Sequence, residues 1–70
     1  MKKGEKVRIV ISVVDYLNEG DIYEVTAGIG DKSIFGEMKS TTAFEFECAA
    51  GSVFCSSLDN SHAEMEIVNE

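Results

Sequence analysis

Two stretches of the chain alternate apolar and acidic residues with a period of two, and this pattern constrains the fold more than any other feature. The first stretch is Phe44–Cys48 and the second is Ala63–Ile67. A period of two is typical of a β-strand that turns one face to a core and the other to water. Because glutamates occupy the outward positions, the pattern predicts a small all-β protein with an acidic surface.

The first third of the chain predicts two further strands joined by a long polar loop. Val7–Val13 is rich in β-branched residues, and Ile22–Ala27 again alternates. The loop Asp15–Asp21 between them ends in a Gly-Asp turn signal, and we expect Tyr16 or Leu17 to be tucked inward. The residues predicted to face the core on these strands are Val7, Ile9, Ile11, Val13, Tyr23 and Val25.

The second half of the chain is predicted to contain a tight hairpin and a closing strand. Ala43–Ala49 and Val53–Ser56 would pair around a turn at Gly51-Ser52, because glycine before a small polar residue suits a type II′ turn. The polar segment Ser57–His62 predicts a turn that includes one turn of 3₁₀ helix, followed by a strand at Glu64–Val68. Residues 33–43 have a weak pattern that fits either a loop or an extra hairpin.

Length and composition point to one domain spanning residues 1–70. A hydrophobic content of 44% is sufficient for a packed core. Two cysteines are too few for a disulfide-stapled secreted protein, and no signal peptide or membrane-spanning stretch is evident. We therefore expect a cytoplasmic protein in a reducing environment, without membrane attachment.

Three segments resemble the SH3-like small β-barrel family, in particular its KOW-type and phage-encoded members. Lys6–Val10 resembles their opening strand, Glu19–Val25 resembles the entry to their second strand, and Leu58 followed by Met65–Val68 resembles their turn into a closing strand. The resemblance implies a five-stranded SH3-like barrel with a long loop or extra hairpin between strands two and three. It also implies a ligand surface formed by the loops at residues 15–21 and 28–43.

The distribution of charge suggests the kind of partner. The net charge is −7, and residues after position 8 hold two lysines against twelve carboxylates. Such a body repels nucleic acid and favours a partner with a basic surface. We therefore predict a non-enzymatic interaction module that binds and modulates a host protein, and the resemblance to phage-encoded domains implies that a phage or mobile element encodes it. The predicted partner-binding residues are Asp15, Tyr16, Glu19, Asp21, Glu24, Glu45 and Glu47. A solvated acidic face that only maintains solubility is the simpler alternative.

Two other functions remain open from the sequence. Four of the six cationic residues lie within the first eight positions, which would suit a KOW-like nucleic-acid-binding module. Several apolar residues outside the predicted core would suit a homo-oligomer that binds a small ligand. The cationic residues are Lys2, Lys3, Lys6 and Arg8, and the apolar residues that would suit an oligomer are Val10, Val14, Phe35 and Met38.

The residues that could carry chemistry do not form a recognisable motif. With a turn at Gly51-Ser52, Cys48 would face Cys55 closely enough for a disulfide, although a reducing environment favours two buried thiols. Cys48, Cys55 and His62 recur every seven residues, but a zinc site typically contains two cysteines separated by only a few residues, and no such pair is present. Ser56, Ser57, Asp59 and His62 crowd one turn without a nucleophile elbow. We therefore predict no catalytic residue, no metal site and no cofactor.

Overall fold

The computed structural model describes residues 1–33 and 35–68, and in this part of the chain the fold is all-β. No described residue is helical, so none belongs to a helix long and apolar enough to cross a membrane. Ile34, which belongs to the ambiguous segment 33–43, lies outside the described residues. The strands are β1 (Lys6–Ser12), β2 (Ile22–Ala27), β3 (Lys32–Ser33), β4 (Gly36–Glu37), β5 (Phe44–Cys48), β6 (Gly51–Cys55) and β7 (Ala63–Val68).

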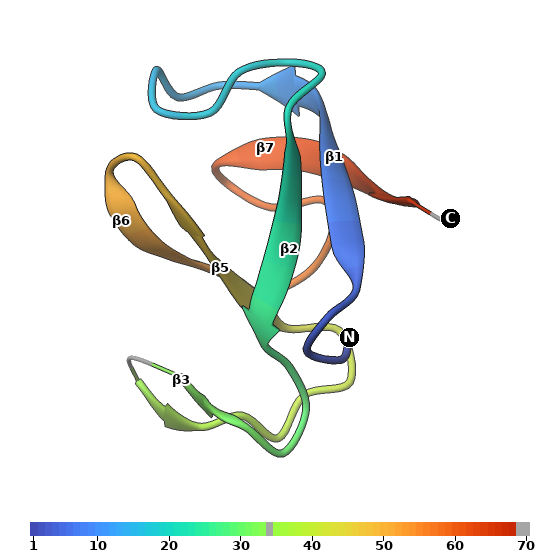
Figure 1. Cartoon of the computed structure of the whole chain (residues 1–70), viewed down its shortest axis with the longest axis vertical. Helices are drawn as coiled ribbons and strands as arrows, with labels where there is room; N and C mark the ends of the chain where they lie inside the picture. Colours follow the sequence, from blue (N-terminus) through green and yellow to red (C-terminus); the bar gives the residue numbers. More distant parts are fainter. Residues whose placement is uncertain (34, 69–70) are drawn as a thin grey trace.

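Five of the strands form one antiparallel sheet in the order β6-β5-β2-β1-β7 (Figure 1). The first half of β2 pairs with β1 and its second half pairs with β5, so β2 connects the two parts of the sheet. The short strands β3 and β4 form a separate hairpin between β2 and β5, which is one of the two arrangements expected for this segment. Within the described residues no ladder joins β6 to β7, and these two strands are therefore the edges of the sheet.

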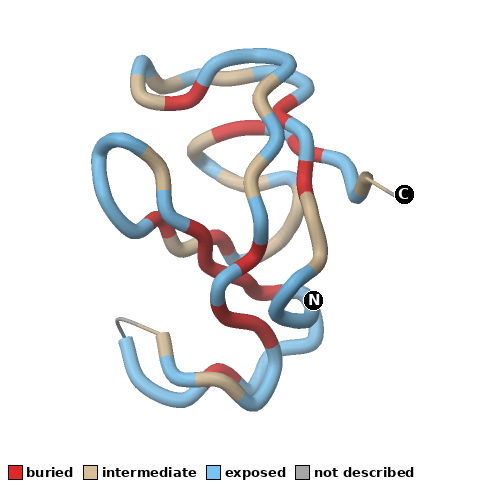
Figure 2. Tube along the Cα trace, in the orientation of Figure 1, coloured by how far each residue is buried: buried red, intermediate tan, exposed pale blue. Residues whose placement is uncertain are grey.

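The main core lies on one face of the sheet, and its buried residues follow the strands in Figure 2. Phe46 and Phe44 are fully buried, and the ring of Tyr23 stacks on Phe46 with 4.8 Å between ring centroids. Leu17 is buried as expected for the first loop. The other fully buried side chains of this core include Val7, Ile9, Val25 and Cys55.

The inward face predicted for the first strand is correct only for its first half. Val7 and Ile9 are buried, whereas Ile11 is exposed and Val13, beyond the strand, is 70% exposed. The pairing of β1 with β7 shifts register between Ile9 and Ile11. Such a bulge interrupts the alternation of inward and outward side chains, and Ile11 and Val13, which follow it, face solvent.

A second, smaller cluster lies on the opposite face of β5 and β6. Met38 follows the β3–β4 hairpin and packs with Ala27, Ala43 and Phe54. Glu45 is the cross-strand partner of both Phe54 and Ala27, and it is only 7% exposed. The prediction that Glu45 faces solvent is therefore wrong, because the segment around Met38 adds a layer over this part of the sheet.

The β5–β6 hairpin has a different register from the predicted one. Cys48 pairs with Gly51, so the turn consists of Ala49-Ala50, and Gly51 follows it with a φ of +111°. Cys55 pairs with Phe44. It is therefore roughly 13 Å from Cys48 along the strands, well beyond the distance of about 7 Å that a disulfide can span. Both cysteines are free thiols.

The segment Ser57–His62 is a turn without helical structure, contrary to the expected 3₁₀ turn. The side chain of Asn60 organises it: Oδ1 accepts hydrogen bonds from the backbone N–H groups of His62 and Ala63, and Nδ2 donates to the carbonyl of Ser57. Asparagine often makes such local bonds in place of a helical turn. The turn leads the chain directly into β7.

Candidate functional site

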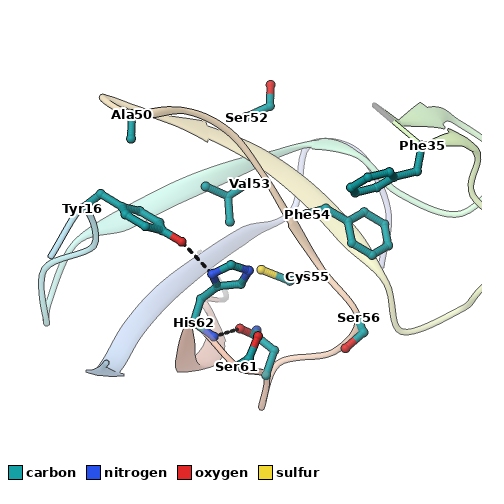
Figure 3. A pocket seen from close by; sticks show the side chains of 11 residues that line it. Tyr16, Phe35, Ala50, Ser52, Val53, Phe54, Cys55, Ser56, Ser61 and His62 are labelled. Atoms are coloured by element: carbon teal, nitrogen blue, oxygen red, sulfur yellow. Dashed lines mark hydrogen bonds between the residues drawn. The ribbon is translucent and has the colours of Figure 1, made fainter. Parts of the chain in front are cut away.

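A groove of about 520 Å³ runs along the free edge of β6. Five consecutive residues from Ser52 to Ser56 line it, together with Ala50 at the hairpin tip. The remaining lining residues come from three other segments and are shown in Figure 3. They are Tyr16 from the first loop, Phe35 from the β3–β4 hairpin, and Asn60, Ser61 and His62 from the turn before β7.

The two faces of β6 give the groove two different walls. Val53 and Cys55 are buried and pair with Phe46 and Phe44, so their side chains belong to the face of the main core. Phe54 belongs to the opposite face and to the second cluster. The groove therefore extends around the edge of the strand.

Tyr16 and His62 form the wall on the side of the main core. Tyr16 Oη lies 2.6 Å from Nδ1 of His62, and the two half-buried side chains are joined by a hydrogen bond (Figure 3). Asn60 fixes the backbone of His62 through the bond described above. The groove wall is thus held by residues of two loops that are far apart in the sequence.

Phe35 forms the wall on the other side. Its ring meets the ring of Phe54 edge-on, with 5.3 Å between centroids and an angle of 88°. Phe35 is nevertheless 76% exposed. A phenylalanine in a core or an interface is normally mostly buried, so the contact with Phe54 leaves most of the Phe35 ring uncovered. Phe35 therefore offers apolar surface at the mouth of the groove.

The chemical groups of the groove do not form an activated nucleophile. Burial raises the pKa of the Cys55 thiol to about 12, and a hydrogen bond from Asn60 lowers it only partly. Cys55 is therefore a thiol at neutral pH, and the thiolate is the nucleophilic form. The hydroxyl of Ser57 donates to the backbone carbonyl of Asp59. Among the described residues, no three His, Cys, Asp or Glu side chains are placed to hold a metal ion.

The seven predicted partner-binding residues, six of them acidic, have different environments in the structure. Asp15 and Glu19 are exposed on the first loop, where Asp21 accepts a hydrogen bond from the hydroxyl of Tyr23. Glu24 and Glu47 are exposed on β2 and β5, and each is next to a member of the pair formed by Val25 and Phe46. Tyr16 lines the groove, whereas Glu45 is buried beneath the segment around Met38.

The cationic residues of the N-terminal segment are divided between the sheet and the surface. Arg8 lies on β1, and its Nη1 is 2.6 Å from Oε1 of Glu66 on β7. Lys6 lies opposite Glu24. The backbone of the first residues is fixed, since Gly4 donates to the carbonyl of Val25. The sheet thus places Lys6 and Arg8 beside carboxylates, and the backbone that carries Lys2 and Lys3 is held against β2.

The apolar residues that suggested an oligomer have different environments in the structure. Met38 is buried, and Val14 packs against the main core. Val10 and Phe35 remain exposed. Two of these four residues are therefore covered within the chain itself.

One feature of the sequence marks the strand that borders this groove. Of the strands that the structure describes, β6 is the only one without a charged residue. The contributions of Phe35 and Tyr16 depend on tertiary contacts and have no local signature. Comparisons of this chain with protein-family models, with curated proteins and with solved structures gave no match.

Proposed function

We propose that this chain is a non-enzymatic protein-interaction module with an SH3-like arrangement of strands, and that its partner has a basic surface. The arrangement is supported by the order β6-β5-β2-β1-β7, by the long loop after β1 and by the tight β5–β6 hairpin. The interaction role is supported by the open groove with exposed apolar surface beside β6.

The charge around the groove is the observation that carries this proposal. Three exposed charged residues adjoin the described groove lining, and all are acidic. Asp15 precedes Tyr16, Asp59 precedes Asn60, and Glu47 pairs with Ser52. Electrostatic complementarity of this kind speeds association and selects against partners of like charge.

The proposal is tested by immobilising the parent chain and its charge variants, and by comparing the proteins that each captures from a bacterial lysate. Asp15→Lys and Glu47→Lys together reverse two of the exposed carboxylates that adjoin the groove. Glu66→Lys is the control, because Glu66 is exposed on β7, where it pairs with Arg8, and neither residue lines the groove. We expect a specific protein that elutes as salt is raised, and that binds roughly tenfold more weakly to the double variant alone.

Two results would contradict the proposal. Retention of the same protein by the double variant, without any effect of salt, would exclude an electrostatic surface. Recovery of nucleic acid in place of protein would favour the KOW-like alternative. That alternative is best tested by replacing Lys2 and Lys3 with glutamine, because deleting residues 1–4 also removes the backbone contact of Gly4 with Val25.

A further inference from the structure

We propose that the free edge of β6 binds an extended, basic segment of the partner protein as an added antiparallel or parallel strand. This inference rests on the proposed function and specifies how the partner is bound. The partner strand would lie about 4.8 Å from β6, which is the normal spacing of strands in a sheet. The added strand would occupy the groove between the edge of β6 and the turn that precedes β7.

The register of the hairpin identifies the backbone groups that would bind such a strand. In a two-residue hairpin the closing pair, here Cys48 and Gly51, is hydrogen-bonded, and every second pair after it is bonded as well. The backbone groups of Val53 and Cys55 therefore point toward β5. Those of Ser52 and Phe54 point toward the groove, and no described backbone group is bonded to them there.

The two edges of the sheet differ in how well they are protected from strand addition. Natural edge strands usually carry charges, proline or a bulge that prevent pairing with another chain. On β7, Glu64 and Glu66 are exposed and the pairing with β1 contains a bulge. β6 has the sequence Gly-Ser-Val-Phe-Cys, with neither charge nor proline, and it pairs with β5 in an uninterrupted register. The unprotected edge is the one that borders the groove.

The walls of the groove match the alternating side chains of a strand. Side chains on one face of the added strand would meet Tyr16 and His62, and those on the other face would meet Phe35 (Figure 3). The exposed charges that adjoin the groove, on Asp15, Glu47 and Asp59, favour lysine or arginine on the partner. A second copy of this chain is a poorer match, because each copy carries a net charge of −7 and an uncharged β6.

Hydrogen exchange measured by NMR with a defined peptide tests the inference. The probe is a short peptide of alternating lysine and valine, and its control is the same peptide with every backbone nitrogen methylated, so that neither of its edges can donate to β6. The control keeps the charges and side chains but cannot form the ladder. We expect the unmodified peptide to slow exchange of the Ser52 and Phe54 amides at least roughly tenfold, since ladder bonds protect amides from exchange, and the methylated peptide to leave them unchanged.

Ser52→Pro is the matching change in the protein. The backbone N–H of Ser52 points toward the groove, so proline at this position removes a hydrogen bond to the partner and none to β5. Edge strands tolerate proline at such positions. We expect this variant to keep the thermal stability of the parent chain and to lose peptide binding, whereas Ser52→Ala binds normally. Equal binding of both peptides, or unchanged binding by Ser52→Pro, would overturn the inference.

The outcomes also separate this inference from the proposed function. If reversal of Asp15 and Glu47 weakens capture of the partner but Ser52→Pro does not, the acidic surface binds in another way and strand addition is wrong. If only Ser52→Pro has an effect, strand addition holds and the electrostatic function fails. Protection of Ser52 and Phe54 that rises with protein concentration alone, together with a dimer in sedimentation, would assign the edge to a second copy and overturn the partner-strand proposal.

Discussion

The hydroxyl of Tyr16 is hydrogen-bonded to Nδ1 of His62 at 2.6 Å, across 46 positions of sequence. This bond joins the long loop after β1 to the turn that precedes β7. Because both residues line the groove beside β6, the same contact fixes the fold of two loops and the shape of the candidate site.

Removing this contact should loosen both loops. We expect Tyr16→Phe to lower the free energy of unfolding by about 1 kcal/mol, the usual net value of a partly buried hydrogen bond. Urea denaturation of Tyr16→Phe, His62→Ala and the double variant gives the coupling between the two side chains. Strictly additive losses would show that the two residues stabilise the protein independently.

Glu45 and Glu47 should respond differently to charge reversal, although they are neighbours on one strand. Glu45 is 7% exposed beneath the segment around Met38, so Glu45→Lys places a longer cation in a covered site and should cost about 3 kcal/mol or more. Glu47→Lys changes an exposed side chain, and it should alter the free energy of unfolding by no more than about 0.5 kcal/mol. Thermal denaturation of the two variants measures the difference.

Glu45→Gln is the control for this comparison, because it keeps the shape of the side chain and removes only the charge. Its loss should be smaller than that of Glu45→Lys. Similar stability of the two lysine variants would mean that the layer over Glu45 does not form in solution.

The different environments of these two glutamates show what a local pattern can and cannot predict. Alternation in Phe44–Cys48 correctly predicts a strand and the inward side of Phe44 and Phe46. It cannot predict what covers the opposite face. That face depends on the segment around Met38, where apolar residues are sparse and no period is evident.

The register of the β5–β6 hairpin was unpredictable for a related reason. Moving the turn from Gly51-Ser52 to Ala49-Ala50 changes every cross-strand neighbour by four residues but leaves each side chain on the same face. Burial patterns therefore fit both registers equally well. In the observed register Gly51 follows the turn with a φ of +111°, a backbone conformation that favours glycine. The sequence alone does not show at which position of the turn this conformation falls. The groove has no local signature in the sequence, because Phe35 and Tyr16 reach it only through tertiary packing.

The buried thiol of Cys55 should make stability depend on alkaline pH. The pKa of this thiol is raised to about 12 from 9.0, chiefly by burial. The unfolded chain therefore releases the proton at lower pH than the folded chain does, and stability is complete below about pH 9 and falls as pH rises toward 12. Chemical denaturation at a series of pH values measures this decline.

Cys55→Ala should flatten the alkaline decline, whatever its effect on stability at neutral pH. Some dependence will remain, since burial and the nearby Asp21 also raise the pKa of Tyr23. The same thiol should react slowly with iodoacetamide in the folded protein, and the half-buried Cys48 faster. An unchanged pH profile in Cys55→Ala would show that other groups cause the decline.

Gly28 should be intolerant of any side chain because the N-terminal backbone lies directly against it. A Cβ atom at this position would meet the carbonyl oxygen of Met1 and come within 2.7 Å of the Cα of Lys2. The amide of Ile29 donates to the same Met1 carbonyl at 2.9 Å, so the first residues cannot shift without losing a bond. We expect Gly28→Ala to cost about 1–3 kcal/mol, a typical value for overpacking.

Comparison with a chain that lacks Met1 and Lys2 tests whether this contact is the cause. In the shortened chain Gly28→Ala should cost much less, because the atoms that it would meet are absent. Gly20→Ala is the control: Gly20 has a φ of +92° and no neighbour within 4 Å of the added Cβ, so its cost arises from the backbone and should be equal in both chains. An equal cost of Gly28→Ala in both chains would show that Met1 and Lys2 do not pack against Gly28 in solution.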